Sequence, residues 1–331
     1  MAIILDLVEQ VAPLAEGMRT RISLTSAADI DQARAWCERS GNTLVAADDG
    51  WLTVQRGRAR FAAAPVPAAR RPGVRLWIYT NFDCNLECSY CCVRSSPRAA
   101  RRALGAELIT QLALEAVDAG VKEIYLTGGE PFIVPDIGES IRACAERLPT
   151  TVLTNAMLFK GRRLEVLTSL PRTNLALQIS LDSPTPERHD RNRGAGAWLR
   201  TVEGIQLVLG LGFRVRIAAT VDPADKQAVA DEPRFHELLD EWAIAHDDRL
   251  IRPWAQRGKA DHGTVVTQEA VIPEVTITAD GVYWHPVAAT DPDMLVTTAI
   301  LPLRAAIDQV TTRFDAQRES AAAAAELFPC A

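Results

Sequence analysis

Four of the seven cysteines in this 331-residue chain lie within nine residues, at Cys84, Cys88, Cys91 and Cys92. The first three have the spacing C-x3-C-x2-C, and Tyr90 directly precedes the third. Three thiolates on one short loop can bind three irons of a [4Fe–4S] cube. The fourth iron then lacks a protein ligand. An open coordination position is what a cluster that does chemistry needs.

A structural zinc site is the alternative interpretation of this loop. Zinc usually takes four ligands, commonly as two separated pairs. Cys92 is a poor fourth ligand because adjacent cysteines seldom reach one metal, and Cys37, Cys144 and Cys330 are distant in sequence. A non-catalytic iron–sulfur or zinc protein, acting as a sensor or scaffold, therefore stays open as an alternative function.

Further polar residues follow strands that come later in the chain. The turn Gly128-Gly129-Glu130-Pro131 comes after the second strand of the central region. Its glycines expose backbone, and the Glu130 carboxylate can accept from an ammonium group. Asn155 follows the third strand, Ser180 ends the fourth with Asp182 just after it, and Arg193 comes a little later.

The elements that position these residues alternate between strand and helix from Val74 onward. We expect strands at 74–79, 123–127, 151–154, 175–180, 214–220 and 249–251. Helices are expected between them, at 106–119, 137–147, 162–168, 197–211 and 226–245. This alternation predicts an α/β fold with a parallel sheet that curls into a partial barrel. Residues at the carboxyl ends of parallel strands then meet at one face.

The cysteine spacing and the Gly-Gly-Glu-Pro turn together resemble the radical S-adenosylmethionine (SAM) superfamily. The run Ser180-Leu-Asp182, with His189-Asp190 and Arg193-Gly194 after it, is similar to a segment of its MoaA/peptide-maturase branch. The resemblance covers about residues 74–255. It implies a partial (β/α)6 TIM-like barrel. It also implies an enzyme whose cluster cleaves SAM to a 5′-deoxyadenosyl radical, which abstracts hydrogen from a substrate.

The resemblance also implies roles for individual residues. Cys84, Cys88 and Cys91 would bind the cluster, and the SAM-binding residues would be Gly128, Gly129, Glu130, Pro131, Asn155, Ser180, Asp182 and Arg193. Glu130 would accept from the methionine amine of SAM. Ser180 and Asp182 would lie near the ribose and carboxylate, and Arg193 would pair with that carboxylate. Trp254, after the sixth strand, would line the adenine.

Two further regions flank the barrel. The pattern of residues 1–60 predicts a small α+β sandwich that resembles the TusA/SirA-like fold without its active-site cysteine. Residues 61–73 are expected to form an Ala/Pro linker. After a barrel at 74–262, residues 263–331 predict a short extension of one β-hairpin and one helix. Its hairpin around Asp280-Gly281 resembles a degenerate SPASM or twitch module without an auxiliary cluster. His285 is there a weak candidate for a proton donor or substrate contact.

Composition narrows the function further. The formal net charge is −6, which disfavours a general nucleic-acid binder. No apolar run long enough for a membrane span occurs, and clustered thiols favour a cytoplasmic protein. We expect a peptide or small-molecule substrate and an electron donor such as flavodoxin or ferredoxin. A radical SAM enzyme that transfers sulfur or a methyl group is a further alternative.

Overall fold

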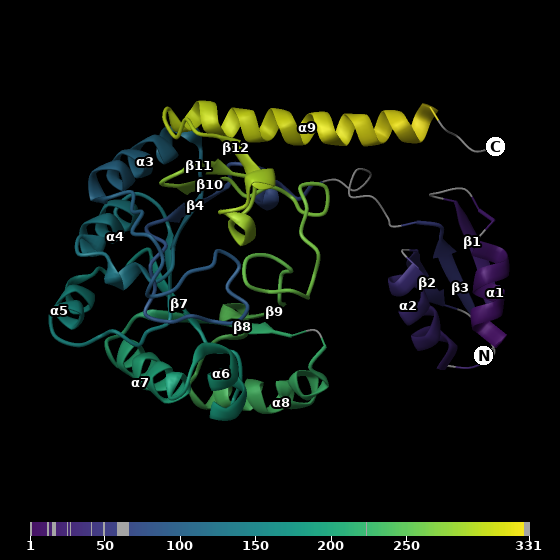
Figure 1. Ribbon diagram of the computed structural model, residues 1–331, viewed down its shortest axis with the longest axis horizontal. Coiled ribbons are helices and arrows are strands. Elements are labelled where there is room, and N and C mark those ends of the chain that lie inside the picture. The colour runs from purple at the N-terminus through teal and green to yellow at the C-terminus, as the bar shows by residue number, and fades with distance from the viewer. Residues whose placement is uncertain are drawn as a thin grey trace. The chain divides into compact units, whose positions relative to one another are not determined.

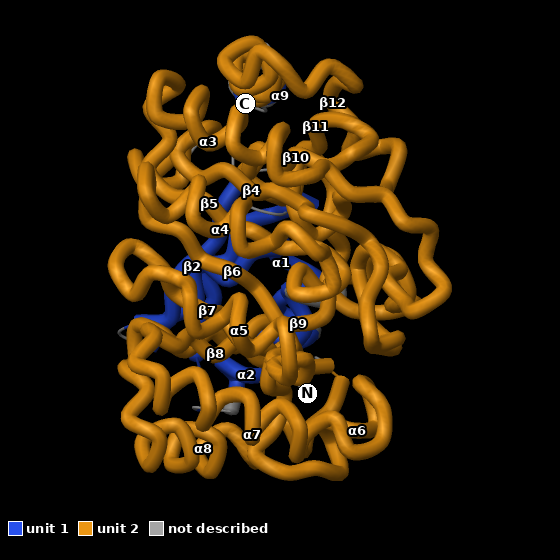
Figure 2. The backbone as a smooth tube through the Cα atoms, turned by 90° about the vertical axis from the view of Figure 1, so that its left-hand side faces the viewer, with its two compact units in different colours: residues 1–65, 316–331 blue, residues 66–315 orange. Residues whose placement is uncertain are grey.

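The computed structural model describes residues 2–11, 13–14, 18–24, 26, 28–40, 42–48, 50–57, 66–222 and 224–327. The chain divides into two compact units (Figure 2). One comprises residues 1–65 with 316–331, and the other residues 66–315. The predicted domain limits at 60, 73 and 262 remain proposals, and residues 61–65 of the expected linker and Cys330 lie outside the described residues.

The smaller unit contains two helices and three strands. They are α1 (Ala2–Val11), β1 (Arg19–Ser23), α2 (Ala28–Ser40), β2 (Thr43–Asp48) and β3 (Trp51–Gln55). The strands form an antiparallel sheet in the order β1-β3-β2. Apolar side chains from both helices and all three strands form its core, and Cys37 is buried among them. Its likeness to the TusA/SirA-like fold stays a prediction.

The larger unit is built on a nine-stranded sheet whose six central strands run parallel (Figure 1). These strands are β4 (Arg75–Tyr79), β5 (Glu123–Thr127), β6 (Thr150–Thr154), β7 (Leu175–Ser180), β8 (Arg214–Val221) and β9 (Arg249–Pro253). They pair in chain order, from β4 to β9. The predicted partial barrel is confirmed.

Helices connect these strands and lie outside the sheet (Figure 1). They are α3 (Ala106–Ala119), α4 (Ile137–Ala145), α5 (Arg162–Ser169), α6 (Pro186–Arg193), α7 (Ala197–Gly210) and α8 (Lys226–Glu241). Their apolar faces pack on one face of the sheet and form a continuous core with strand residues such as Leu126, Leu177 and Ile217. Because every crossover returns to the same edge, the carboxyl ends of all six strands face the same side.

The C-terminal hairpin extends this sheet. Strand β10 (Thr276–Thr278) pairs parallel with β4, β11 (Gly281–Tyr283) pairs with β10, and β12 (Leu295–Thr297) pairs with β11. The expected extension therefore lies beside the strand that precedes the cysteine loop. Helix α9 (Leu303–Leu327) follows, and its first turns are buried against the same core.

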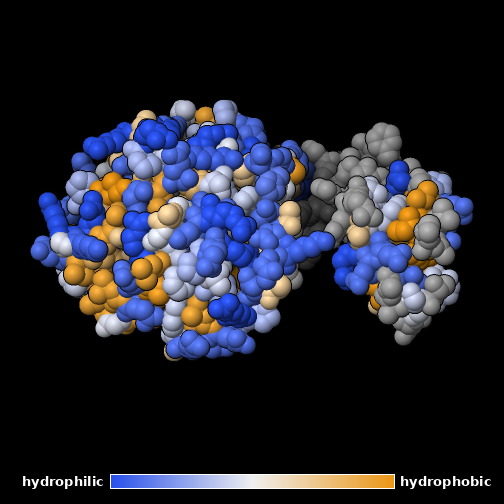
Figure 3. Space-filling model, turned by 60° about the horizontal axis from the view of Figure 1, so that its bottom comes forward, coloured by the Kyte–Doolittle hydropathy of each residue, from blue (hydrophilic) through white to orange (hydrophobic). Residues whose placement is uncertain are grey.

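The surface of the larger unit mixes polar and apolar side chains (Figure 3). Its exposed large apolar residues are Leu114, Val117, Leu199, Leu250 and Val265. Among the described residues, none of the helices combines the length and apolarity that crossing a bilayer requires.

Candidate functional site

The cysteine loop leaves the carboxyl end of β4 and is closed by backbone hydrogen bonds. The Thr80 amide donates to the Thr127 carbonyl at 2.8 Å, which ties the start of the loop to the end of β5. Further along, the Cys84 amide donates to the Ser96 carbonyl at 3.2 Å. The segment from Cys84 to Ser96 is thus a closed loop at the carboxyl ends of the parallel strands.

Two of the three predicted ligand thiols accept hydrogen bonds from backbone amides. Cys84 is buried, and Cys88 and Cys91 are half-buried. The Leu86 amide donates to Cys84 Sγ at 3.3 Å, and the Ser95 amide donates to Cys91 Sγ at 3.2 Å. Such N–H groups stabilise a thiolate. Burial raises the pKa of the Cys84 thiol to about 12, so a bound cation is needed to keep it ionised.

The donor set of this loop fits a [4Fe–4S] cluster in its chemistry. Cys84, Cys88 and Cys91 offer three thiolates, and each can bind one iron of a cube. Among the described residues, no three His, Cys, Asp or Glu side chains form a group that could hold a single metal ion.

The Gly128–Pro131 turn is fastened to the cysteine loop through the backbone. The Gly129 amide donates to the Asn81 carbonyl, and the Glu130 amide donates to the Asp83 carbonyl, each at 3.1 Å. A Cβ at Gly128 would overlap the side chain of Asn81, and one at Gly129 would overlap the Asp83 backbone. Both glycines are therefore needed for the close approach of two loops that are far apart in sequence.

The Glu130 carboxylate is buried and bridges two strand ends. Oε1 accepts from the Phe132 amide at 3.1 Å and the Thr154 hydroxyl at 2.8 Å, and Oε2 accepts from the Asn155 amide at 2.8 Å. Desolvation raises its pKa, and these donors act in the opposite direction. Three of its roughly four acceptor positions are occupied by protein. The contact between Glu130 and the SAM amine stays a prediction. Only the one remaining acceptor position of the carboxylate would be open to that amine.

The next two strand ends bring further predicted residues to this edge. The Asn155 side-chain amide donates to Asn85 Oδ1 at 2.8 Å, so the end of β6 contacts the cysteine loop directly. Ser180 ends β7 with a half-buried side chain. Both lie at the same edge as the cysteines, as the strand order requires.

Asp182 and Arg193 contact each other. Arg193 donates to Asp182 through Nε at 2.6 Å and Nη2 at 3.2 Å, and both side chains are buried. The Tyr90 hydroxyl donates to Asp182 Oδ2 at 2.5 Å, which brings the cysteine loop into the pair. The expectation that both residues bind SAM stays untested, but the structure gives each a protein partner.

The segment after β9 packs on the cysteine loop, a contact that sequence reasoning missed. The Lys259 amide donates to the Cys91 carbonyl at 3.0 Å, and Lys259 Nζ lies 3.1 Å from a Glu87 carboxylate oxygen. A Cβ at Gly258 would overlap the backbone of Cys91 and Cys92. Trp254 contacts the Tyr90 ring, with 5.2 Å between the ring centroids. Among the described residues its indole N–H has no hydrogen-bond partner.

His285 lies just after β11 and caps the N-terminus of the 3-10 turn Pro286–Ala288. Its Nδ1 accepts from the Val287 amide at 3.3 Å at the start of a short 3-10 turn. Desolvation lowers its pKa to about 4, with Arg70 and Arg252 adding to the effect. The ring is therefore neutral near pH 7. A role in proton donation or substrate contact stays a prediction.

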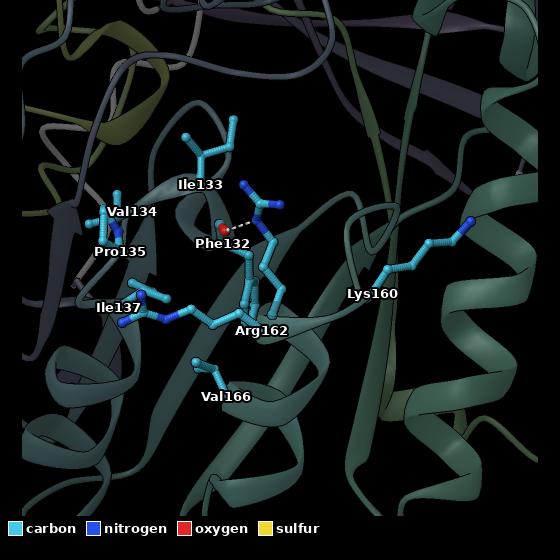
Figure 4. A pocket seen from close by; sticks show the side chains of 9 residues that line it. Phe132, Ile133, Val134, Pro135, Ile137, Lys160, Arg162 and Val166 are labelled. Atoms are coloured by element: carbon cyan, nitrogen blue, oxygen red, sulfur yellow. Dashed lines mark hydrogen bonds between the residues drawn. The ribbon is translucent and has the colours of Figure 1, made fainter.

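A cavity of about 270 Å³ opens beside the Gly-Gly-Glu-Pro turn, and none of the predicted cofactor residues lines it (Figure 4). Apolar side chains that include Phe132, Ile137 and Val166 line it together with Arg162 and Arg163. Arg163 Nε donates to the Phe132 carbonyl at 2.8 Å. The cavity lies outside the set of strand-end residues described above.

Comparison with known proteins points to one family. The family described as "Radical SAM superfamily" matches residues 78–224, which include the cysteine loop, the Gly-Gly-Glu-Pro turn and Asp182. This part of the chain is a radical SAM domain. The match and the similar proteins below support an enzyme of that superfamily's MoaA/peptide-maturase branch, with a [4Fe–4S] cluster and SAM as cofactors.

Similar proteins differ in their reactions. The "Antilisterial bacteriocin subtilosin biosynthesis protein AlbA" of Bacillus subtilis is 36% identical over 143 residues, or 42% of this chain and 31% of the relative. A "GTP 3',8-cyclase" of Picosynechococcus is 30% identical over 193 residues, or 52% of this chain and 57% of the relative. The chain thus spans less than two thirds of the length of either relative. The activities in their names are therefore not assigned to this chain by the comparison.

A solved structure supports the fold of this radical SAM enzyme. "Native anSMEcpe with bound AdoMet" matches with a TM-score of 0.55 and 12% identity over 72% of this chain and 82% of that one. At that identity the likeness concerns the fold alone. It agrees with the parallel strand order observed here.

Proposed function

We propose that Cys84, Cys88 and Cys91 bind the [4Fe–4S] cluster and that Gly128–Pro131, Asn155 and Ser180 surround SAM. When bound, the reduced cluster and SAM supply hydrogen-atom abstraction by a 5′-deoxyadenosyl radical. The observation that carries the proposal is the pair of backbone hydrogen bonds from Gly129 and Glu130 to the cysteine loop. They put the glycine turn and the three thiols at one strand edge, where a single SAM molecule can contact both.

The protein's own contribution is to fix and seal this edge. Glu130 holds the ends of β5 and β6 at a set spacing through its three buried hydrogen bonds. Phe82 and Leu86, on the cysteine loop itself, are both buried. Such a rigid, shielded site keeps a reactive species away from solvent.

The substrate we propose is a peptide. Support comes from the relative named for bacteriocin biosynthesis, which has the higher identity of the two relatives compared above. The alternative is a nucleotide, because the GTP cyclase relative covers more of this chain. We also propose a flavodoxin- or ferredoxin-type electron donor, and a cytoplasmic location because unpaired clustered thiols need a reducing compartment.

Deuterium transfer tests the substrate class. Cluster-loaded protein would be incubated anaerobically with SAM, dithionite and either deuterated synthetic peptides of varied sequence or GTP deuterated on its ribose. We expect deuterium in 5′-deoxyadenosine with at least one peptide and none with GTP. Deuterium from GTP alone would contradict the peptide assignment and leave the cofactor assignment intact. The matched control is Cys88→Ala, which should transfer none.

A further inference from the structure

The structure joins Tyr90, Asp182 and Arg193 in one buried network that ends on the cysteine loop. We infer that these three residues form a clamp that positions the segment Cys88–Cys91 instead of binding SAM. The inference rests on the proposed cluster ligands and assigns these residues a positioning role. It replaces the ribose and carboxylate contacts that the sequence resemblance implies for Asp182 and Arg193.

The hydrogen bonds of Asp182 leave its carboxylate no free acceptor position. Oδ2 accepts from the Tyr90 hydroxyl at 2.5 Å and Arg193 Nε at 2.6 Å. Oδ1 accepts from Arg193 Nη2 at 3.2 Å and the Thr220 amide at 3.0 Å. An ionised carboxylate offers about four acceptor positions. Protein groups therefore occupy the positions that ribose hydroxyls would use.

The pair is also neutral as a unit. The side chains of Arg193 and Asp182 are 8% and 4% exposed, so water solvates their charges little. Each charge is instead compensated by the opposite charge of its partner. Arg193 holds the pKa of Asp182 below its usual value despite burial, and Asp182 raises the pKa of Arg193. A guanidinium that is already paired is a weaker partner for the SAM carboxylate than a free one.

The clamp reaches the cysteine loop at consecutive residues. Arg193 lies over the Tyr90 ring, 5.5 Å from its centroid, and the Ser89 amide donates to the Asn192 carbonyl at 3.0 Å. The end of α6 thus holds the two residues between Cys88 and Cys91. The Asp182 amide donates to His189 Nδ1 at 3.2 Å, which anchors the middle of α6 to the same aspartate.

The test measures the reduction potential and EPR g-values of the reconstituted cluster without SAM. Arg193→Gln and Asp182→Asn should each shift the potential and the g-values, because each breaks the pair that holds the Cys88–Cys91 segment. Tyr90→Phe removes one hydroxyl with little risk to folding and should change the g-values. Its matched control is Tyr125→Phe, because Tyr125 donates to Glu123 near the opposite end of the barrel. That control should leave both readouts unchanged.

Two outcomes would overturn the clamp. Either the variants leave the SAM-free potential and g-values at wild-type values, or they raise the Kd for SAM more than tenfold without any other change. An apoprotein readout needs no cluster: Tyr90→Phe should speed alkylation of Cys88 relative to Tyr125→Phe, and equal rates would contradict the clamp. If wild-type protein fails to bind iron at all, the proposed function fails instead, and the two failures are distinguishable.

Discussion

Glu130 gives a prediction whose size follows from its hydrogen bonds. In Glu130→Gln the amide oxygen can replace Oε1 and keep the bonds from Phe132 and Thr154. The amide nitrogen then faces the Asn155 N–H, which loses its acceptor at Oε2. A lost bond with an unsatisfied buried donor costs about 1–3 kcal/mol, and weakening two charge-assisted bonds to neutral ones costs about 1 kcal/mol more.

We therefore expect Glu130→Gln to lower the free energy of unfolding by about 2–4 kcal/mol. A domain of this size changes its Tm by about 2–4 °C per kcal/mol, so the melting temperature should fall by about 5–15 °C. The assay is thermal unfolding of the apoprotein followed by circular dichroism at pH 7. The matched control is the exposed Glu203→Gln, which should melt within about 1 °C of wild type. A Glu130→Gln protein that melts with wild type would refute the bridging role.

Two further predictions concern the segment after β9. Gly258→Ala places a methyl group on the Cys91 and Cys92 backbone at a φ of +64°, so iron bound per chain should fall well below that of Gly210→Ala, where a Cβ meets open space. Equal iron content would contradict the packing of this segment on the loop. Asp261 and Asp222 raise the pKa of His262, so its NMR titration midpoint should lie above 6.5 and fall in Asp222→Asn. Any stabilisation from this contact is complete below pH 6.5 and disappears as pH rises through the raised pKa.

Most barrel elements could be predicted because their signals are local. Strands at 123–127 and 175–180 and the helix at 106–119 have the predicted bounds, since apolar periodicity and bounding glycines determine them. Helix α6 was missed, because its residues Pro186–Arg193 are almost all charged or polar and have no apolar face. Contacts from outside the helix hold it: the Asp182 amide donates to His189, and the Ser89 amide, distant in sequence, donates to the Asn192 carbonyl.

The candidate site shows the same division. The spacing of the cysteines and the Gly-Gly-Glu-Pro turn is local, so the family could be predicted from sequence. The hydrogen-bond partners of the polar side chains could not be predicted in the same way. Asp182 contacts Tyr90 across 92 positions of sequence, and Lys259 contacts Glu87 across 172. Sequence reasoning assigned polar residues such as Asp182 and Arg193 to a ligand. In the fold, these buried charged side chains are paired with each other.

Cleavage of SAM by a cluster on Cys84, Cys88 and Cys91 can be tested directly, and Cys92 on the same loop offers a matched control. Wild type, Cys88→Ala and Cys92→Ala would be reconstituted anaerobically with iron and sulfide, reduced with dithionite and given SAM. Mass spectrometry would then follow 5′-deoxyadenosine. We expect product from wild type and Cys92→Ala and none from Cys88→Ala. Equal product from Cys88→Ala, or loss of product only in Cys92→Ala, would contradict the proposed cluster ligands.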